Sequence, residues 1–438
     1  MSHYRPYPAY RDSGVEWIGQ VPEHWEVARI KRHATLRTER CNDLPAVVTY
    51  IGLEDVEAES GLYKPTDGNS RQSDDSTVGI FYKGDVLYGK LRPYLRKAII
   101  ADRGGACSTE FLVMNTRETL PRWLHQWLLT PNVTQQIEAG CEGTKMPRAD
   151  WEHVGSIELA APDQREQAQI LSVLDREIAR IDALIAKKTR FIELLKEKHH
   201  AFITYAVTKG LNPDVLMKDS GVEWIGAVPE RWGVKQLRHV ASFTNSNVDK
   251  KVYDGQQTVS LCSYTDVYYN EFITADLQFM QATASISEIE QFSLKKGDVI
   301  ITKDSEDPSD IGIPSLVAED ISNVVCSYHL TMIRTPDIDT SRFMHRVLQS
   351  HPTKAHFFVE SSGITRYGLS QGAIGDLRAC FPPQKDRSVI ADCLDRETAR
   401  IDALIVKSQR SINLLKERRA AFITAAVTGQ IDLRHQHE

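Results

Sequence analysis

A long amphipathic helix pattern occurs twice in this chain and limits the folds that the chain can adopt. Residues 174–209 and 394–429 are identical at 25 of 36 positions, at an offset of 220 residues. Apolar residues recur at alternating steps of three and four, flanked by charged residues, which predicts helices with one apolar face. The apolar seam consists of Leu171, Leu174, Ile178, Ile181, Ile185, Ile192, Leu195 and Phe202 in the first pattern and Leu394, Ile401, Ile405, Ile412, Leu415 and Phe422 in the second.

The boundaries of the two patterns agree with helices. Asp163 and Glu166 resemble a capping box, and Gly210 ends the first pattern, whereas the second runs from residues 382–383 to Gly429. A helix of about 45 residues at about 1.5 Å per residue is roughly 70 Å long. Neither helix can bury its seam alone, so we expect the two to pack together as a coiled coil within the chain.

A second repeated element shows that the whole chain is a tandem duplication. Residues 12–27 return at 219–234 with 13 of 16 positions identical. The chain therefore reads as head, variable block and long helix, twice over. The repeated unit is about 210 residues long, which is too long for the short stacking repeats of a solenoid.

The two variable blocks, residues 30–160 and 237–380, have diverged but keep a common skeleton. Short β-type runs broken by Gly, Asp and Pro indicate a mixed α/β globule in each. The segments that still align are 83–90 with 296–303, both beginning Lys-Gly-Asp-Val, and 107–114 with 326–333, both beginning Cys-Ser. Each half is a constant frame with a divergent insert, an arrangement that favours two recognition domains with different targets.

Composition excludes several classes of protein. A chain of 438 residues predicts two to four domains. No apolar run approaches the length of a membrane span, and seven scattered cysteines without a CxxC pair indicate reduced thiols, so we expect a cytoplasmic protein. The net charge of −6 argues mildly against a protein that coats nucleic acid, but permits a sequence reader with its cations on one face.

Two readers on rigid helices would measure a fixed distance along a linear ligand. DNA is the obvious polymer with a fixed repeat, since one helical turn is about 34 Å long.

Together these features resemble the specificity subunit of a Type I restriction-modification system. The resemblance covers essentially the whole chain and rests on an architecture that is repeated twice in order. It is carried by the heads at 17–25 and 224–232, the two Lys-Gly-Asp segments, the Gly-Thr-Lys-Met turn at 143–146, and two Pro-initiated helices beginning near 164 and 384.

This resemblance implies an α+β fold with two tandem α/β target recognition domains, each followed by a long helix, the helices forming an antiparallel intramolecular coiled coil. Each domain reads one half of an asymmetric bipartite site in double-stranded DNA. The helices space the domains and dock two modification subunits, which methylate adenine using S-adenosylmethionine; separate restriction subunits cut DNA. The implied segments are 1–160 and 212–380 for the recognition domains, and 161–211 and 381–438 for the spacer helices with the C-terminal tail.

The family's specificity subunit is not an enzyme and needs no cofactor, and the residues agree with that. The sequence contains no DPPY-type tetrad, no GxGxxG and no GxxxxGK[ST]. The nearest approach to a metal-dependent nuclease site is an acidic segment, for which a solvated loop is the default interpretation. That segment comprises Asp298, Asp304, Glu306, Asp307 and Asp310 with Lys303.

Candidate DNA contacts in the first block lie in two loops. The first combines four cations with an aromatic residue, which suits phosphate contact and groove reading. The second is the Gly-Thr-Lys-Met turn. The candidates are Lys90, Arg92, Tyr94, Arg96 and Lys97 in the first loop, and Thr144, Lys145 and Arg148 in the second.

The second block departs from this pattern. Lys303 aligns with Lys90, but acidic residues follow it. Their carboxylates would repel phosphate, although they could accept a hydrogen bond from the amino group of cytosine. The counterpart of the second loop contains Thr365, Arg366 and Tyr367, and Lys250 and Lys251 near Asn245 and Asn247 are alternative contacts.

A different class of function stays open, because the acidic net charge is also compatible with a duplicated coiled-coil adaptor that binds proteins. The repeated Trp17, Trp25, Trp224 and Trp232 lie in the constant frame, so we expect them to pack between head and helix. Repeated polar pairs such as Arg180/Arg400 and Asp182/Asp402 are equally compatible with partner contacts and with a solvated face.

Overall fold

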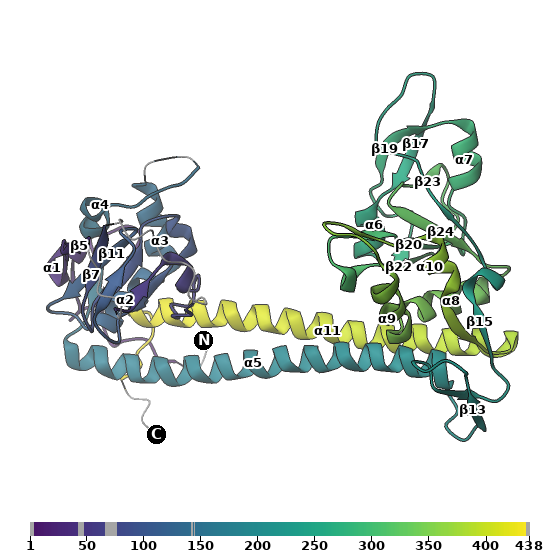
Figure 1. The fold of residues 1–438 in the computed structure, drawn as a ribbon. Coiled ribbons are helices and arrows are strands. Elements are labelled where there is room, and N and C mark those ends of the chain that lie inside the picture. The colour runs from purple at the N-terminus through teal and green to yellow at the C-terminus, as the bar shows by residue number, and fades with distance from the viewer. Residues whose placement is uncertain (1–3, 43–47, 66–76, 142, 144, 435–438) are drawn as a thin grey trace. The chain divides into compact units, whose positions relative to one another are not determined.

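Two compact units contain the residues that the computed structural model describes, namely 4–42, 48–65, 77–141, 143 and 145–434 (Figure 1). Met1–Lys188 and Arg410–Glu438 belong to unit 1, and Thr189–Gln409 form unit 2. Each unit thus takes one head, one variable block and a part of both long helices.

Unit 1 continues from a two-stranded head hairpin into two four-stranded sheets. Their strand orders are β4-β11-β8-β9 and β5-β7-β10-β6, and β12 pairs with β3, which returns the end of the block to its start. The elements of the block and head are β1 (Tyr10–Asp12), β2 (Gln20–Pro22), β3 (Glu26–Arg29), α1 (Ile30–His33), β4 (Ala34–Leu36), β5 (Arg40–Cys41), β6 (Tyr50–Ile51), η1 (Leu53–Asp55), β7 (Val78–Phe81), β8 (Val86–Gly89), η2 (Pro93–Leu95), β9 (Ala98–Ile100), β10 (Gly105–Cys107), β11 (Phe111–Thr116), α2 (Pro121–Leu128), α3 (Pro131–Ala139), α4 (Trp151–Ser156) and β12 (Glu158–Ala161).

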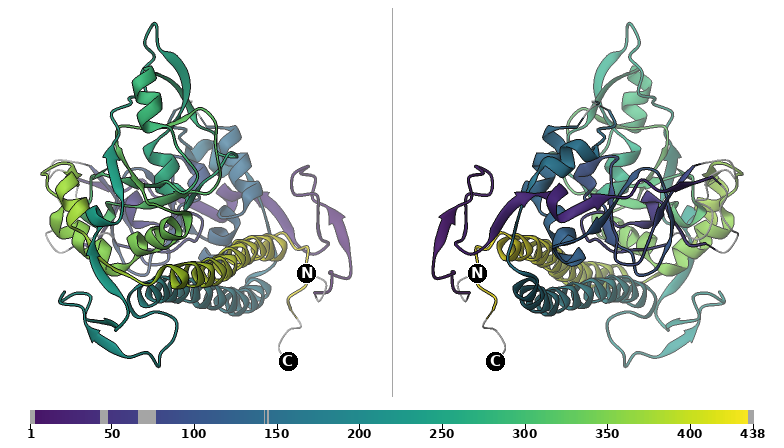
Figure 2. Two further views of the ribbon diagram at one scale, coloured as in Figure 1. Left: turned by 90° about the vertical axis from the view of Figure 1, so that its right-hand side faces the viewer. Right: turned by 90° about the vertical axis from the view of Figure 1, so that its left-hand side faces the viewer.

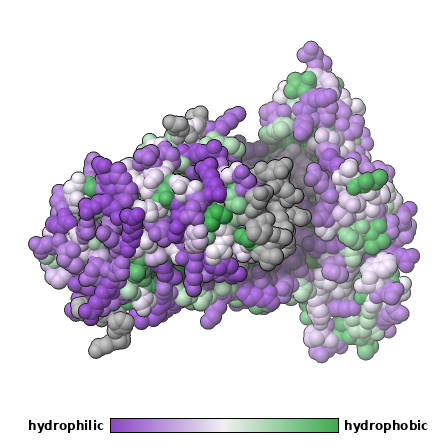
Figure 3. Space-filling model, turned by 60° about the vertical axis from the view of Figure 1, so that its left-hand side comes forward, coloured by the Kyte–Doolittle hydropathy of each residue, from purple (hydrophilic) through white to green (hydrophobic). Residues whose placement is uncertain are grey.

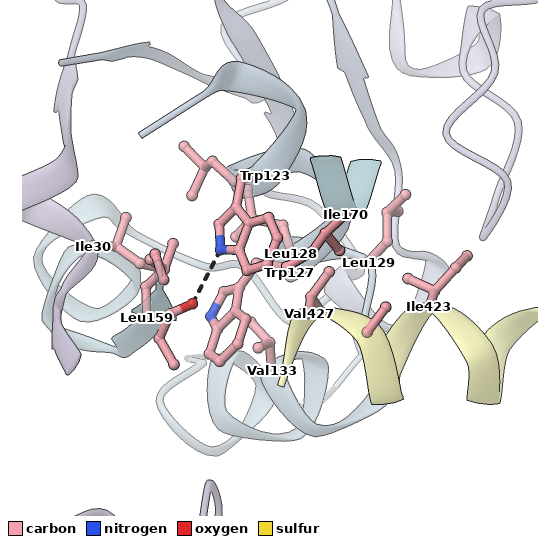
Figure 4. Close-up of a cluster of buried hydrophobic side chains, with 14 of the residues drawn as sticks. Ile30, Trp123, Trp127, Leu128, Leu129, Val133, Leu159, Ile170, Ile423 and Val427 are labelled. Atoms are coloured by element: carbon pink, nitrogen blue, oxygen red, sulfur yellow. Dashed lines mark hydrogen bonds between the residues drawn. The ribbon is translucent and has the colours of Figure 1, made fainter. Parts of the chain in front are cut away.

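The core of unit 1 joins its recognition block to both long helices. Proline begins α2, and its apolar residues recur on one face, so Trp123 and Trp127 are fully buried. The indole N–H of Trp123 donates to the Ala160 carbonyl at 3.0 Å, and Ile170 and Val427 from the two long helices enter the same cluster (Figure 4). The block is therefore packed firmly on the helices of its own unit.

Unit 2 repeats this plan with a larger insert. Its sheets have the orders β16-β24-β20-β22-β18 and β19-β17-β23, with β15 paired to β26 and β21 to β25. The elements are β13 (Met217–Asp219), β14 (Ala227–Pro229), β15 (Gly233–Gln236), η3 (Leu237–His239), β16 (Ser242–Asn245), β17 (Gln257–Cys262), α6 (Tyr264–Tyr269), β18 (Phe272–Ile273), β19 (Met280–Ala284), α7 (Ile286–Phe292), β20 (Val299–Thr302), β21 (Asp304–Ser305), η4 (Pro308–Asp310), β22 (Pro314–Val317), β23 (Val324–Cys326), β24 (Leu330–Arg334), α8 (Ile338–Gln349), α9 (His351–Glu360), β25 (Tyr367–Gly368), α10 (Gln371–Asp376) and β26 (Arg378–Phe381).

The two long helices, α5 (Gln164–Lys209) and α11 (Gln384–Val427), pack together side by side (Figure 2). In unit 1 the start of α5 packs on the end of α11, and Asp182 pairs with Arg419 at 3.1 Å. In unit 2 the end of α5 packs on the start of α11, and His199 lies 3.8 Å from Asp402. The helices are antiparallel within each unit, which confirms the predicted pairing. The buried seam residues include Leu171, Leu174, Ile181, Ile192, Leu195, Leu394, Ile401, Ile412 and Phe422.

The two heads fold as the same hairpin. Tyr10 pairs with Pro22 in β1–β2, and Met217 pairs with Pro229 in β13–β14. Trp25 and Trp232 are buried as expected, and Trp25 donates its indole N–H to the Glu166 carboxylate on α5 at 3.2 Å. Trp17 is half-buried and packs on Trp127 of α2 in the recognition block. The prediction for Trp224 was wrong, since this residue is 54% exposed.

The surface is mostly hydrophilic on the face shown in Figure 3, with hydrophobic residues in small scattered patches. Among the described residues, no helix combines the length and the apolar character needed to cross a membrane. The seven cysteines, all within the described ranges, are thiols and form no disulfide.

Candidate nucleic-acid interface

Two loops that are distant in the sequence meet in unit 1. Residues 89–97 follow β8, and residues 143–149 precede α4. Leu91 and Arg148 form an antiparallel bridge between them. The two candidate loops of the first block are therefore parts of one surface, which we call the first loop pair.

Backbone hydrogen bonds fix this surface to the sheet. The Lys90 N–H donates to the Glu110 carbonyl at 2.7 Å, and the Lys90 carbonyl accepts from the Ala149 N–H at 3.0 Å. The Arg92 N–H donates to the Pro147 carbonyl at 2.9 Å. Because both sides are bonded, the cations stand on a rigid support.

Glu110 gathers the cations of the first loop pair. Its Oε1 accepts from Nη2 of Arg148 at 2.9 Å. Burial lowers the pKa of Lys90, an effect that the Glu110 carboxylate opposes and Arg148 reinforces. The Glu110 carboxylate thus pairs with Arg148 and acts electrostatically on Lys90. Two cations against one carboxylate leave a net positive site suited to a phosphate or to the acceptor edge of guanine.

The backbone of the first loop is unusual at two arginines. Arg92 and Arg96 have φ values of +53° and +47°, in the left-handed region, on either side of the 3₁₀ turn Pro93–Leu95. A residue with a side chain pays an energetic cost in this region, and such residues cluster at functional sites. The bends point the intervening Tyr94 outward, where it is exposed.

Two of the predicted contacts have roles inside the protein. Arg96 is largely buried and its Nη2 lies 2.6 Å from Glu59, while Lys97 donates from Nζ to the Leu53 carbonyl at 2.7 Å. Both side chains tie the loop to neighbouring turns. They are weaker candidates for DNA contact than the sequence pattern suggested.

The remaining candidates of the first block differ in their exposure. Arg92, Tyr94, Lys145 and Arg148 are exposed at the surface. Thr144 lies outside the described residues.

Unit 2 contains a second loop pair, residues 302–310 with 363–369, built on the same hydrogen bonds. The Lys303 N–H donates to the His329 carbonyl at 3.1 Å, and the Lys303 carbonyl accepts from the Leu369 N–H at 2.8 Å. Asp304 pairs with Gly368 where Leu91 pairs with Arg148 in unit 1. The alignment of Lys303 with Lys90 is therefore correct in three dimensions.

The chemistry of the second loop pair is different. His329 occupies the place of Glu110, and its Nδ1 lies 2.7 Å from Asp304 Oδ2 and 3.4 Å from Arg366 Nη2. Thr365 and Arg366 are exposed, and Tyr367 is half-buried in β25. This site offers acceptors and one arginine fork, where the first offers mainly cations.

The acidic segment of unit 2 is engaged in local contacts. Asp307 caps the turn η4 by accepting from the Ser309 N–H at 2.8 Å, which lowers the pKa of Asp307. Asp310 accepts from the Tyr268 hydroxyl at 2.5 Å and raises the pKa of that phenol to about 12. Among the described residues, no three His, Cys, Asp or Glu side chains are grouped to hold a metal ion.

The Lys-Gly-Asp motifs have a structural role. Asp85 is buried and accepts from Arg37 Nε at 2.6 Å, and Asp298 is buried and accepts from Arg334 Nε at 2.8 Å. Asp298 is therefore engaged in a buried ion pair and is not part of the acidic loop with which the sequence grouped it.

The alternative cations of unit 2 lie near the second loop pair. Lys250 and Lys251 are exposed in a segment whose Val248 bridges to Ser327, two residues before His329. Asn245 is held by the Thr331 hydroxyl at 2.7 Å, and Asn247 is exposed.

Sequence reasoning did not identify Glu110 and His329 as site residues. Both occupy the fourth position of the aligned segments that begin Cys-Ser. The signal available in the sequence was that the two aligned segments carry an acidic residue in one block and a histidine in the other at this position.

Comparisons with known proteins agree with this architecture. No family model matches the sequence. The chain is 23% identical over 184 residues to the Type I restriction enzyme EcoDI specificity subunit of Escherichia coli, an alignment that spans only 41% of either protein. A chain from a study of assembly and conformational transition in a type I R-M system matches with a TM-score of 0.72 at 16% identity, over 93% of this chain and 98% of that one. The HsdS subunit from Thermoanaerobacter tengcongensis matches with a TM-score of 0.53 at 15% identity, over 94% and 98%.

The chain has the fold of a type I specificity subunit. In this fold each loop pair belongs to a recognition block that packs on α5 and α11 within its own unit.

Proposed function

We propose that this chain is the non-enzymatic DNA-recognition subunit of a Type I restriction-modification complex in the cytoplasm. The observation that carries the proposal is the relation between the two loop pairs. They share their backbone hydrogen bonds at Lys90 and Lys303 but differ in side-chain chemistry around Glu110 and His329. Equal scaffolds with unequal surfaces are what a reader of an asymmetric bipartite site needs.

The first recognition domain, residues 1–160, reads its half-site with cations. Arg92, Lys145 and Arg148 supply exposed positive charge. Lys90, whose backbone is bonded to Glu110 and Ala149, adds a further cation. Arginine forks favour the acceptor edge of guanine, and lysine favours phosphate. We therefore propose a half-site that contains guanine.

The second domain, residues 212–380, reads its half-site with a mixed surface. Arg366 supplies one fork, whereas Asp304 beside His329 supplies an acceptor. Carboxylates accept from the amino group of cytosine, so this domain reads a different sequence. Phosphate attraction comes from Lys303 with Lys250 and Lys251.

The long helices supply the docking surface for two modification subunits, through which restriction subunits join. Exposed leucines flank the seam on the same side of the antiparallel pair, because each precedes a seam residue by one position. Unit 1 has Leu184 and Leu414, and unit 2 has the repeat-equivalent Leu404 and Leu194, all between 40% and 55% exposed. Two equivalent apolar patches support two copies of one partner.

The decisive experiment is sequencing of methylated sites in a host that carries a hybrid chain. The hybrid has residues 30–160 in place of the second block, so both domains read the same half-site. We expect methylation at an inverted repeat of the first half-site. Retention of the original asymmetric site would overturn the assignment of readers, and loss of all DNA binding with the partners present would favour the protein-binding adaptor.

A further inference from the structure

The first turn of α5 in unit 1 is covered by both ends of the chain. The Tyr7 hydroxyl donates to Glu166 Oε1 at 3.0 Å, and Trp25 and His24 of head 1 reach the same carboxylate. The guanidinium of Arg434 lies over the Tyr7 ring at 4.7 Å from its centroid. A tyrosine stacked with an arginine therefore seals the space between head 1 and the helix, and Tyr7 is only 3% exposed.

Unit 2 has the same framework at this place. The Glu23 N–H donates to the Ala9 carbonyl in head 1 at 3.1 Å, and the Glu230 N–H donates to the Leu216 carbonyl in head 2 at 2.8 Å. Counting back two residues from these acceptors, Asp214 stands where unit 1 has Tyr7.

The helix position repeats as well. Asp386 corresponds to Glu166 at the repeat offset of 220 residues, and Trp232 corresponds to Trp25.

Unit 2 has one covering segment at this place, where unit 1 has two. A single short linker, residues 210–216, runs from the end of α5 to head 2, whereas unit 1 uses the C-terminal tail together with the N-terminal segment. Asp214, which stands in the place of the buried Tyr7, is exposed.

The result is a groove of about 290 Å³ lined by Trp232, Asp386, Val389, Ile390, Val215 and Lys209. Val389 is 60% exposed and the neighbouring Leu216 is 76% exposed. The Asp386 carboxylate makes no hydrogen bond or ion pair with any of the described residues. A groove whose lining includes an exposed, unpartnered carboxylate corresponds in position to the sealed site of unit 1.

We propose that this groove binds an extended segment of another protein that presents a tyrosine and an arginine to Asp386. The chemistry follows from unit 1, where a tyrosine and an arginine occupy the equivalent space on Glu166. The N-terminal segment of a second copy is not the occupant, because its Tyr7 is already buried in its own unit. The site is separate from the loop pairs and occurs once in each chain, unlike the duplicated leucine patches.

A peptide of residues 4–9, Tyr-Arg-Pro-Tyr-Pro-Ala, is a suitable probe because it carries both side chains. We expect fluorescence anisotropy with the labelled peptide and the full chain to give saturable binding at one site. Asp386→Asn should weaken binding at least about tenfold, since hydrogen bonds to a charged group contribute that much. Asp214→Tyr should abolish binding by filling the groove from within.

Glu223→Gln is the matched control, because this exposed carboxylate of head 2 lies outside the groove lining. It should leave the affinity unchanged, and circular dichroism of each variant establishes that the fold is retained. Absence of peptide binding to the unchanged chain would overturn the proposal. It would also be overturned if Asp386→Asn and Asp214→Tyr bound the peptide as tightly as the unchanged chain does. A dimer of the chain that Asp214→Tyr dissociates would overturn the assignment to another protein.

Discussion

Arg419 on α11 places its Nε 3.1 Å from Asp182 on α5, and the same two repeat positions in unit 2 are His199 and Asp402 at 3.8 Å. This interhelical contact thus contains a histidine in unit 2 only. Burial lowers the pKa of His199, although Asp402 opposes the shift, and burial raises the pKa of Asp402.

We expect His199 to make unit 2 sensitive to acid. The unfolded imidazole takes up a proton at a higher pH than the folded one, so the free energy of unfolding falls as pH drops below about 6.5. The raised pKa of Asp402 has the opposite effect, because the folded carboxyl group takes up its proton at a higher pH than the unfolded one. This effect lies at a lower pH than that of His199, just above the pKa of the carboxyl group in the unfolded chain. His199→Arg should reduce the loss of stability between pH 7 and 5.5 by about 0.5–1 kcal/mol, measured as thermal unfolding midpoints.

The reciprocal change, Arg419→His, is the control. It should introduce an acid-sensitive pair into unit 1 and steepen the pH dependence. An unchanged pH profile in both variants would show that other groups dominate, such as the buried His125 and His345, whose pKa values burial lowers to about 4.

Most of the architecture was readable from the sequence because it depends on local periodicity and on internal repetition. The seam positions gave α5 and α11, and the shared Lys-Gly-Asp and Cys-Ser segments gave the equivalence of Lys90 and Lys303. Trp224 was mispredicted because identical head sequences do not ensure identical neighbours. Trp17 packs on Trp127, with ring centroids 5.9 Å apart, whereas the aligned position in the second block is Val347.

The candidate site was predictable only in part. Lys90 and Arg148 were recognised separately, but the Leu91–Arg148 bridge that unites their loops is a long-range contact without a local signal. Arg96 and Lys97 looked like DNA contacts because both are cations, yet their bonds to Glu59 and Leu53 are fixed by tertiary structure.

The repeated leucines predict the stoichiometry of the complex. Leu184→Asp puts a charge into the patch of unit 1, so we expect one modification subunit to bind instead of two. Adding Leu404→Asp should remove the second. Native mass spectrometry gives the count directly, and Val406→Asp is the control because this residue is 68% exposed but lies off the leucine side.

Cations of the first loop pair should set the salt dependence of DNA binding. Arg148→Ala and Lys145→Ala each remove about one phosphate or base contact, so the slope of log K against log salt should fall by about 0.9 per phosphate contact. Binding is measured with the modification subunits present. Arg103→Ala serves as control, since this exposed arginine is paired with its neighbour Asp102, and an equal effect there would indicate nonspecific attraction.

Arg366 should govern the second half-site alone. Arg366→Ala removes the only arginine fork beside His329 in the described part of the second loop pair, and we expect a loss of about 1–3 kcal/mol of discrimination at one base pair. Sequencing of methylated sites should then show a relaxed second half-site beside an unaltered first one. A relaxed site with Lys250→Ala and not with Arg366→Ala would move the contact to the Lys250 segment.

The helices should set the length of the unread gap between the half-sites. Inserting seven residues after Thr189 in α5 and seven after Ser411 in α11 preserves the heptad seam, because these points face each other in the antiparallel pairing. The added length is about 10 Å, so the gap in the methylated site should grow by roughly one to three base pairs while both half-sites stay the same. About one helical turn inserted after Thr189 alone also lengthens α5, but it shifts one seam against the other and should weaken the complex. A gap of the original length with the paired insertion would mean that the helices do not measure the distance.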